Sequence, residues 1–116
     1  FDKCYEDAAN YSVLDCIQNL RRAGYKLIFV SGRESSCRAE TVRWLKDKCD
    51  LNDDAYILYM RETGDNRKDS IVKEEIYQRD ILPEYYVSFV LDDRQQVVDA
   101  LREMGLQVWQ VARGDF

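Results

Sequence analysis

A run of apolar residues ends in two adjacent carboxylates and a cation late in this sequence. Residues 86–91 read Tyr-Val-Ser-Phe-Val-Leu, and Asp92, Asp93 and Arg94 follow directly. Buried strands seldom end on two acids, because an unpaired carboxylate is costly to bury. Open α/β sheets bind their ligands at the carboxyl ends of the strands. Mg²⁺ favours one or two carboxylates together with phosphate oxygens and water. The Asp92–Asp93 pair is therefore a candidate Mg²⁺ site for phosphate chemistry.

A second polar group follows another apolar run. Residues 26–30 read Lys-Leu-Ile-Phe-Val, and Ser31, Gly32 and Arg33 come next. Glycine lets backbone N–H groups approach an anion, and a serine hydroxyl adds a donor. The tripeptide alone fits an ordinary turn with a solvated arginine equally well. Whether the tripeptide indicates a phosphate site depends on which other residues lie at the same edge of the sheet.

Cations are concentrated after a third apolar run, residues 56–60. Arg61 follows it directly, and Arg67, Lys68 and Lys73 come soon after in an otherwise acidic chain. Charge runs usually form a solvated loop or helix face, and that alternative stays open for these residues. For the two acids, the alternative is that one of them caps a helix beginning at Arg94.

Strands and helices alternate along the sequence. Apolar spacing predicts helices over 11–23, 39–49, 69–80 and 97–104, with Gly24 and Gly105 as stops and Asp69 or Ser70 as a cap. Short β runs are expected over 26–30, 56–60, 86–91 and 106–111, the first broken by residues 31–33. This order predicts an α/β fold, three-layered and Rossmann-like, with a mainly parallel sheet. The groups that follow the strands would then meet at one edge.

Size and composition set limits on function. The 116 residues suit one domain, and 46% hydrophobic with 34% charged residues is ordinary for a globular protein. A net charge of −5 argues against a generally basic nucleic-acid binder. The sequence has no histidine, and its four cysteines have no C-x-x-C spacing, so zinc binding and histidine-based catalysis are not expected. We expect reduced cysteines and a cytoplasmic protein.

Five segments together resemble a known family. They are VSGRES (30–35), RETGDNRKD (61–69), VKEEI (72–76), LDDRQQVV (91–98) and VWQVARGDF (108–116). In this order and spacing they are similar to the 3′-phosphatase domain of phage-type polynucleotide kinase/phosphatases, within the haloacid-dehalogenase-like superfamily. The resemblance covers nearly the whole of 1–116. It implies a single haloacid-dehalogenase-like domain that hydrolyses phosphate esters with Mg²⁺.

The resemblance also implies roles for individual residues. Ser31 would bind the transferred phosphoryl group. Lys73 would neutralise its oxygens and orient the nucleophile. Asp92, with Asp93, would bind Mg²⁺ directly or through water. Arg33 and Arg61 would contact the phosphate or the nucleotide next to it, and Arg94 would brace the two acids. Phosphoryl transfer needs positioning and charge neutralisation above all, which suits this set.

One motif of the family is absent from these residues. The family opens with a strand ending in D-x-D-G-T, whose first Asp is the nucleophile and whose second is the general acid/base. The sequence contains no such motif and begins with Phe1. The resemblance places the strand that carries it at the centre of the sheet. We expect a C-terminal piece of a longer, active chain rather than a degenerate copy. The 116 residues alone would then be inactive.

The leading expectation is therefore a Mg²⁺-dependent polynucleotide 3′-phosphatase that prepares nucleic-acid ends for sealing. By resemblance a P-loop kinase domain would precede it, in the host-cell cytoplasm if the protein is phage-encoded. A small-molecule phosphatase of the same superfamily and a non-catalytic module that binds phosphorylated ends remain alternatives. An open sheet edge would also favour pairing with a second copy of the chain.

Overall fold

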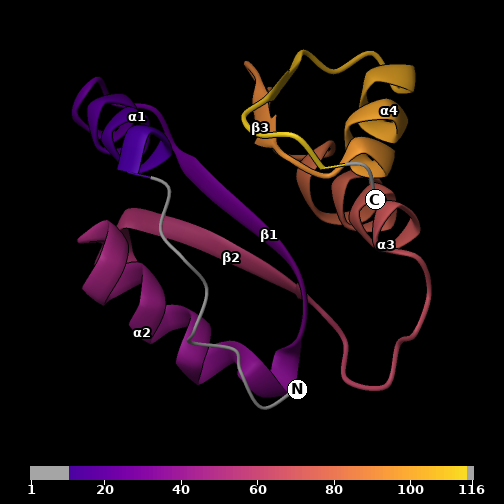
Figure 1. The fold of residues 1–116 in the computed structure, drawn as a ribbon, viewed down its shortest axis with the longest axis horizontal. Coiled ribbons are helices and arrows are strands. Elements are labelled where there is room, and N and C mark those ends of the chain that lie inside the picture. Colours follow the sequence, from indigo (N-terminus) through magenta and orange to yellow (C-terminus); the bar gives the residue numbers. More distant parts are fainter. Residues whose placement is uncertain (1–10, 115–116) are drawn as a thin grey trace. The chain divides into compact units, whose positions relative to one another are not determined.

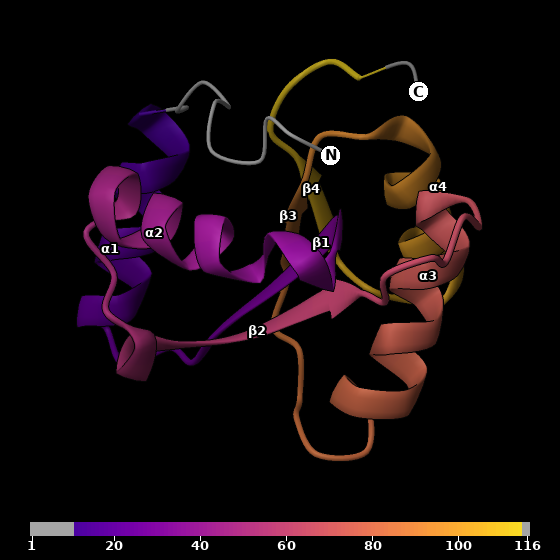
Figure 2. The same cartoon turned by 90° about the horizontal axis from the view of Figure 1, so that it is seen from below.

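The computed structural model describes residues 11–114 of the protein. The chain divides into two compact units, one up to Asp65 and one from Asn66 onwards. Each unit contains a pair of parallel strands, β1–β2 in the first and β3–β4 in the second, among the described residues. Helices accompany both pairs (Figures 1 and 2). The predicted α/β class with parallel strands is confirmed.

The described part of the first unit, residues 11–65, contains two helices and two strands, with a short 3₁₀ turn before α2 and another before β2. In order they are α1 (Tyr11–Arg22), β1 (Leu27–Glu34), α2 (Arg38–Cys49) and β2 (Tyr56–Arg61). Gly24, at φ 94°, lets the chain leave α1 for β1, because this left-handed conformation suits glycine. Both helices bury apolar side chains in one core, made of Leu14, Leu27, Leu45, Cys49 and Leu51.

Strand β1 extends further than its apolar run. The ladder runs from Leu27 opposite Tyr56 to Ser31 opposite Met60, and it resumes at Glu34 opposite Arg61. The expected break at residues 31–33 is therefore wrong: these residues form an irregularity within the strand. A bulge of this kind lets extra residues leave the ladder without ending it, and bulges re-aim side chains near functional sites.

The second unit begins with a helix and ends with a strand. It contains α3 (Asp69–Ile76), a π-helical turn over Tyr77–Ile81, β3 (Val90–Asp92), α4 (Gln95–Glu103) and β4 (Val108–Gln110). Val97 and Val98 of α4 are fully buried and pack with Leu101 and Val108. Gly105, at φ 89°, reverses the chain from α4 toward β4. The core thus fixes α4 against the two strands that precede and follow it.

Strand β3 is shorter than predicted. It pairs only Val90, Leu91 and Asp92 with β4, although the apolar run starts at residue 86. Tyr86 is 93% exposed, so the first part of this run is not core. Phe89 just before the strand instead stacks on Trp109, with ring centroids 4.4 Å apart. Asp92 lies within the ladder as its last paired residue, which fixes its backbone.

The cysteines only partly follow the sequence prediction. Cys16 and Cys49 are free, and burial raises the pKa of the Cys49 thiol to about 11. The expectation of a reduced thiol is wrong for Cys37, which is disulfide-bonded. Disulfide formation depends on proximity in space, which sequence spacing does not report. Cys4 lies outside the described residues. Within residues 11–114, no helix has the length and apolarity that crossing a membrane would need.

Candidate active site

A lysine lies between two carboxylates in the second unit. Lys73 Nζ is 3.4 Å from Asp69 Oδ2 and 3.2 Å from Asp92 Oδ2. Helix α3 places Asp69 and Lys73 one turn apart on the same face, which is the spacing at which helical side chains meet. Strand β3 brings Asp92 from nineteen residues further along the chain. The structure therefore brings together Lys73 and Asp92, two of the predicted site residues.

Arg94 completes this group of charges. Its guanidinium NH1 is 3.3 Å from Asp69 Oδ2, and its backbone N–H donates to Asp92 Oδ1 at 3.0 Å. Arg94 thus contacts Asp69 through its side chain and Asp92 through its backbone. Its predicted role of bracing Asp92 and Asp93 stays a prediction. Both oxygens of Asp92 have a partner: Oδ1 accepts from the backbone of Arg94, and Oδ2 faces Lys73.

Burial makes this group energetically significant. The side chains of Asp69, Asp92 and Lys73 are 6%, 11% and 14% exposed. Charges that are this far removed from water must be paired, because only well-oriented ion pairs and hydrogen bonds offset the free energy of desolvation. Two carboxylates and two cations balance each other here, so the group is neutral as a whole. We call Asp69, Lys73, Asp92 and Arg94 the charge cluster.

Asp69 was not among the predicted site residues. The sequence suggested it as a helix cap, but the cap position of α3 is Lys68, and no side chain makes a capping hydrogen bond there. The prediction of a cap at Asp69 or Ser70 is wrong, because the Asp69 carboxylate is engaged by Lys73 and Arg94 instead. The i,i+4 spacing of Asp69 and Lys73 was the signal that could have identified the pair.

Asp93 is in a different environment from Asp92. It is exposed, and its backbone carbonyl accepts a hydrogen bond from Gln110 Nε2 at 3.1 Å. Within the described part of the chain, no group of three or more potential ligands is arranged to hold a metal ion. Asp92 and Asp93 nevertheless fit Mg²⁺ in kind, because this ion uses few protein carboxylates and completes its shell with phosphate oxygens and water.

Three predicted site residues lie in the first unit. Ser31 Oγ accepts a hydrogen bond from the backbone N–H of Arg33 at 3.1 Å, inside the irregularity of β1. Both residues are half-buried, and burial lowers the pKa of the Arg33 guanidinium. This local turn holds the serine hydroxyl and the arginine close together in the chain. A hydroxyl and a partly desolvated cation two residues apart in the chain are groups that suit a phosphate ligand.

Arg61 anchors the same segment. Its Nε donates to the Gly32 carbonyl at 2.7 Å, and its NH1 donates to the Asp65 carbonyl at 2.9 Å. The side chain therefore ties the end of β2 to the irregular part of β1 and to the loop that follows. These contacts give Arg61 a positioning role for Ser31 and Arg33. The predicted contact of Arg61 with phosphate stays a prediction.

Comparisons with known proteins agree on one family. The family model described as "Polynucleotide kinase PNKP phosphatase domain" matches residues 1–116. A putative bifunctional polynucleotide kinase/RNA ligase of Autographa californica nuclear polyhedrosis virus is 31% identical over 110 residues, which are 93% of this chain and 16% of the viral protein.

Solved structures show the same likeness. A chain in a structure of the Pnkp1/Rnl/Hen1 RNA repair complex is 40% identical, with a TM-score of 0.89 over 98% of this chain and 37% of that chain. A chain in a second structure of the Pnkp1/Rnl/Hen1 complex is 42% identical, with a TM-score of 0.88 over 96% of this chain and 38% of that chain. The chain thus spans less than two fifths of the length of each of these proteins.

The charge cluster predicts that Asp69 stabilises the second unit. Asp69→Asn keeps the shape of the side chain but leaves Lys73 and Arg94 with one buried counter-charge fewer. We expect the free energy of opening, measured by native-state hydrogen exchange of the α4 amides, to fall by about 2–3 kcal/mol.

Glu75 in the same helix provides the control. Its carboxylate pairs with Arg67 and Arg79, but it is 44% exposed. Glu75→Gln should therefore change the same free energy by less than about 1 kcal/mol. Equal effects of the two substitutions would show that burial of the charge cluster contributes nothing.

Proposed function

Because the chain belongs to the polynucleotide kinase PNKP phosphatase domain family, we propose that it is a Mg²⁺-dependent polynucleotide 3′-phosphatase. In this proposal it removes terminal 3′-phosphates during nucleic-acid end repair. The observation that carries the proposal is Lys73 held between Asp69 and Asp92 at the end of β3. A fixed cation beside an oriented carboxylate is what charge neutralisation of a phosphoryl group requires.

Each residue of the charge cluster has a task in this mechanism. Lys73 offers its ammonium group to the phosphoryl oxygens, where negative charge must be neutralised during transfer. Asp69 positions Lys73 from the same helix, and Arg94 holds both acids. Because these contacts exist before substrate arrives, little reorganisation is needed during the reaction.

Asp92 and Asp93 would hold Mg²⁺, and the ion would supply further neutralisation of phosphate charge when bound. The fit rests on the kind of donor, two neighbouring carboxylates at the end of a parallel strand. Asp92 is held by the backbone of Arg94, and Asp93 is exposed. Its exposure leaves the Asp93 carboxylate accessible to a hydrated cation.

The first unit would supply the remaining phosphate contacts. The Arg33 backbone N–H donates to the Ser31 hydroxyl, and Arg61 fixes the backbone between them at Gly32. The Ser31 hydroxyl would then bind the phosphoryl group, and Arg33 would contact the phosphate or the nucleotide next to it. This assignment follows the resemblance of these motifs to the family.

The proposed setting is a larger repair enzyme. We propose that a P-loop kinase domain accompanies this domain, since the viral relative's name includes a polynucleotide kinase. The substrate would be nucleic-acid ends, since two similar chains come from Pnkp1/Rnl/Hen1 structures, one of them described as an RNA repair complex. A cytoplasmic location and a homo-oligomer remain part of the proposal.

Asp92 is the most direct test of the metal site. In the protein at its natural full length, Asp92→Asn keeps the side-chain shape and removes the charge. We expect Mg²⁺-dependent phosphate release from a 3′-phosphorylated oligonucleotide to fall by about 10²-fold or more. Asp54→Asn, at an exposed position of the first unit, should leave the rate unchanged. A near-normal rate in the Asp92 variant would remove this residue from the metal site.

The 116 residues alone should be inactive. The sequence contains no D-x-D-G-T, and the family mechanism needs its first Asp as the nucleophile. We expect no Mg²⁺-dependent phosphate release by the purified 116-residue chain, and release by the protein at its natural full length. Measurable hydrolysis of a 3′-phosphorylated oligonucleotide by the short chain would contradict the need for that motif.

The substrate class separates the proposal from a small-molecule phosphatase. The value of kcat/KM for a 3′-phosphorylated oligonucleotide should exceed that for ribose 5-phosphate by about 10²-fold or more, because binding of the strand contributes to transition-state stabilisation. A preference for the free sugar phosphate would favour the small-molecule alternative. Binding of the oligonucleotide without hydrolysis would favour the non-catalytic module.

A further inference from the structure

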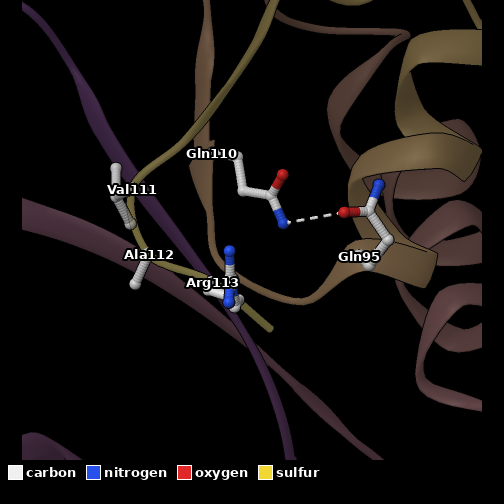
Figure 3. A pocket seen from close by; sticks show the side chains of 5 residues that line it. All are labelled: Gln95, Gln110, Val111, Ala112 and Arg113. Atoms are coloured by element: carbon white, nitrogen blue, oxygen red, sulfur yellow. Dashed lines mark hydrogen bonds between the residues drawn. The ribbon is translucent and has the colours of Figure 1, made fainter. Parts of the chain in front are cut away.

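A polar pocket lies beside the end of β3 in the second unit. Its volume is about 360 Å³, within the roughly 300–1,000 Å³ range of small-ligand sites. It is formed by the start of α4, the last residue of β4 and the segment that follows this strand. The lining residues are Gln95, Gln110, Val111, Ala112 and Arg113 (Figure 3). Among residues 11–114, two carboxamides and one guanidinium line it, and no carboxylate does.

Strand pairing places this pocket next to Asp92. Gln110 is the register partner of Asp92 in the β3–β4 ladder. Neighbouring strands lie about 4.8 Å apart, so the backbones of the two residues are that close. Gln110 Nε2 also donates to the Asp93 carbonyl at 3.1 Å. A ligand whose phosphate was bound by Lys73, beside Asp92, would therefore have its next chemical groups within reach of the pocket.

Hydrogen bonds fix the two carboxamides. Gln95 Nε2 donates to Asp99 Oδ1 at 2.8 Å, and Gln95 Oε1 accepts from Gln110 Nε2 at 3.1 Å. Figure 3 shows this bond as a dashed line between the Gln110 nitrogen and the Gln95 oxygen. The Gln110 Nε2 group is used by these contacts, so Gln110 Oε1 is left as an acceptor for a hydroxyl or N–H of a ligand.

Arg113 provides the charge of the pocket. Its side chain is exposed, and it makes no ion pair with the part of the chain that the structure describes. The next residue, Gly114, is buried, and its carbonyl accepts from the backbone N–H of Gln95 at 2.7 Å. This contact holds the segment against the start of α4. A cation that has no ion-pair partner among the described residues, at a pocket where none of those residues contributes a carboxylate, favours an anionic ligand.

We propose that this pocket binds the nucleotide that bears the 3′-phosphate, with Arg113 paired to the phosphodiester on its 5′ side. This inference rests on the proposed function, which places the terminal phosphate at Lys73, whose Nζ is 3.2 Å from Asp92 Oδ2. Gln110 Oε1 would accept from a donor of the same nucleotide. A guanidinium matches a phosphodiester well, because it offers several donors in one plane.

Binding without turnover tests the pocket. The protein at its natural full length, in EDTA, is titrated with a fluorescent single-stranded oligonucleotide carrying a 3′-phosphate. Arg113→Gln should weaken binding about tenfold and reduce the slope of log Kd against log salt by about 0.7, the value for one phosphate contact on a single strand. Arg22→Gln removes one charge at an exposed position of α1 and should change neither quantity.

Hydrolysis separates failure of the pocket from failure of the proposed function. If the protein hydrolyses the 3′-phosphate but Arg113→Gln binds as tightly and with the same salt slope as the unaltered protein, the pocket assignment is overturned. If Arg113→Gln weakens binding as expected while the unaltered protein releases no phosphate with Mg²⁺, the pocket assignment is supported and the phosphatase proposal fails. Equal weakening by Arg22→Gln would also overturn the assignment, because the effect would then be general electrostatics.

Discussion

The ion pairs of Lys73 with Asp69 and Asp92 are the constraint on which the site of the second unit depends. They join the first turn of α3 to the last residue of β3, two elements separated by a π-helical turn and a long connection. Each of the three side chains is mostly buried, so loss of any one of them would leave a buried charge without its partner. The same contacts that stabilise the packing of α3 near β3 also orient a cation and a carboxylate for phosphate chemistry.

The apolar core of the second unit also helps to position the charge cluster. Val97 and Val98 have no exposed surface, and they fix α4 directly after the Asp92–Asp93 segment. Arg94, at the cap position of α4, can then reach back to both acids. The apolar stripe of one helix thus determines where a charged residue before its first turn lies. The pocket depends on the same packing, because Gln95 is the first residue of α4 and Gln110 donates to the backbone carbonyl of Asp93.

The sequence predicted the elements that have strong local signals. The stripe of α4, the stops at Gly24 and Gly105 and the parallel pairing of strands were correct. Periodicity and glycine conformation are local properties that a sequence reports directly. The extent of the strands was not predictable in the same way. Hydrophobicity suggested that β1 ends before Ser31, but pairing of Glu34 with Arg61 extends it. Likewise, the apolar run before Val90 lacks a strand partner over its first part, and an isolated apolar run does not reveal this.

The sequence predicted only part of the candidate site, because contacts between residues far apart in the chain leave no local signal. Lys73 and Asp92 were identified from motif order, and the structure brings them together. Asp69 was interpreted as a cap because its tertiary partner Arg94 is 25 positions away. The end of the strand from which phosphate is released provides the most direct test of the proposed 3′-phosphatase function. Phosphate release by the full-length protein with Mg²⁺ is compared for one oligonucleotide phosphorylated at either its 3′ or its 5′ end. The account predicts rapid release from the 3′ end and little from the 5′ end. Equal release from both ends, or release from the 5′ end alone, would contradict it.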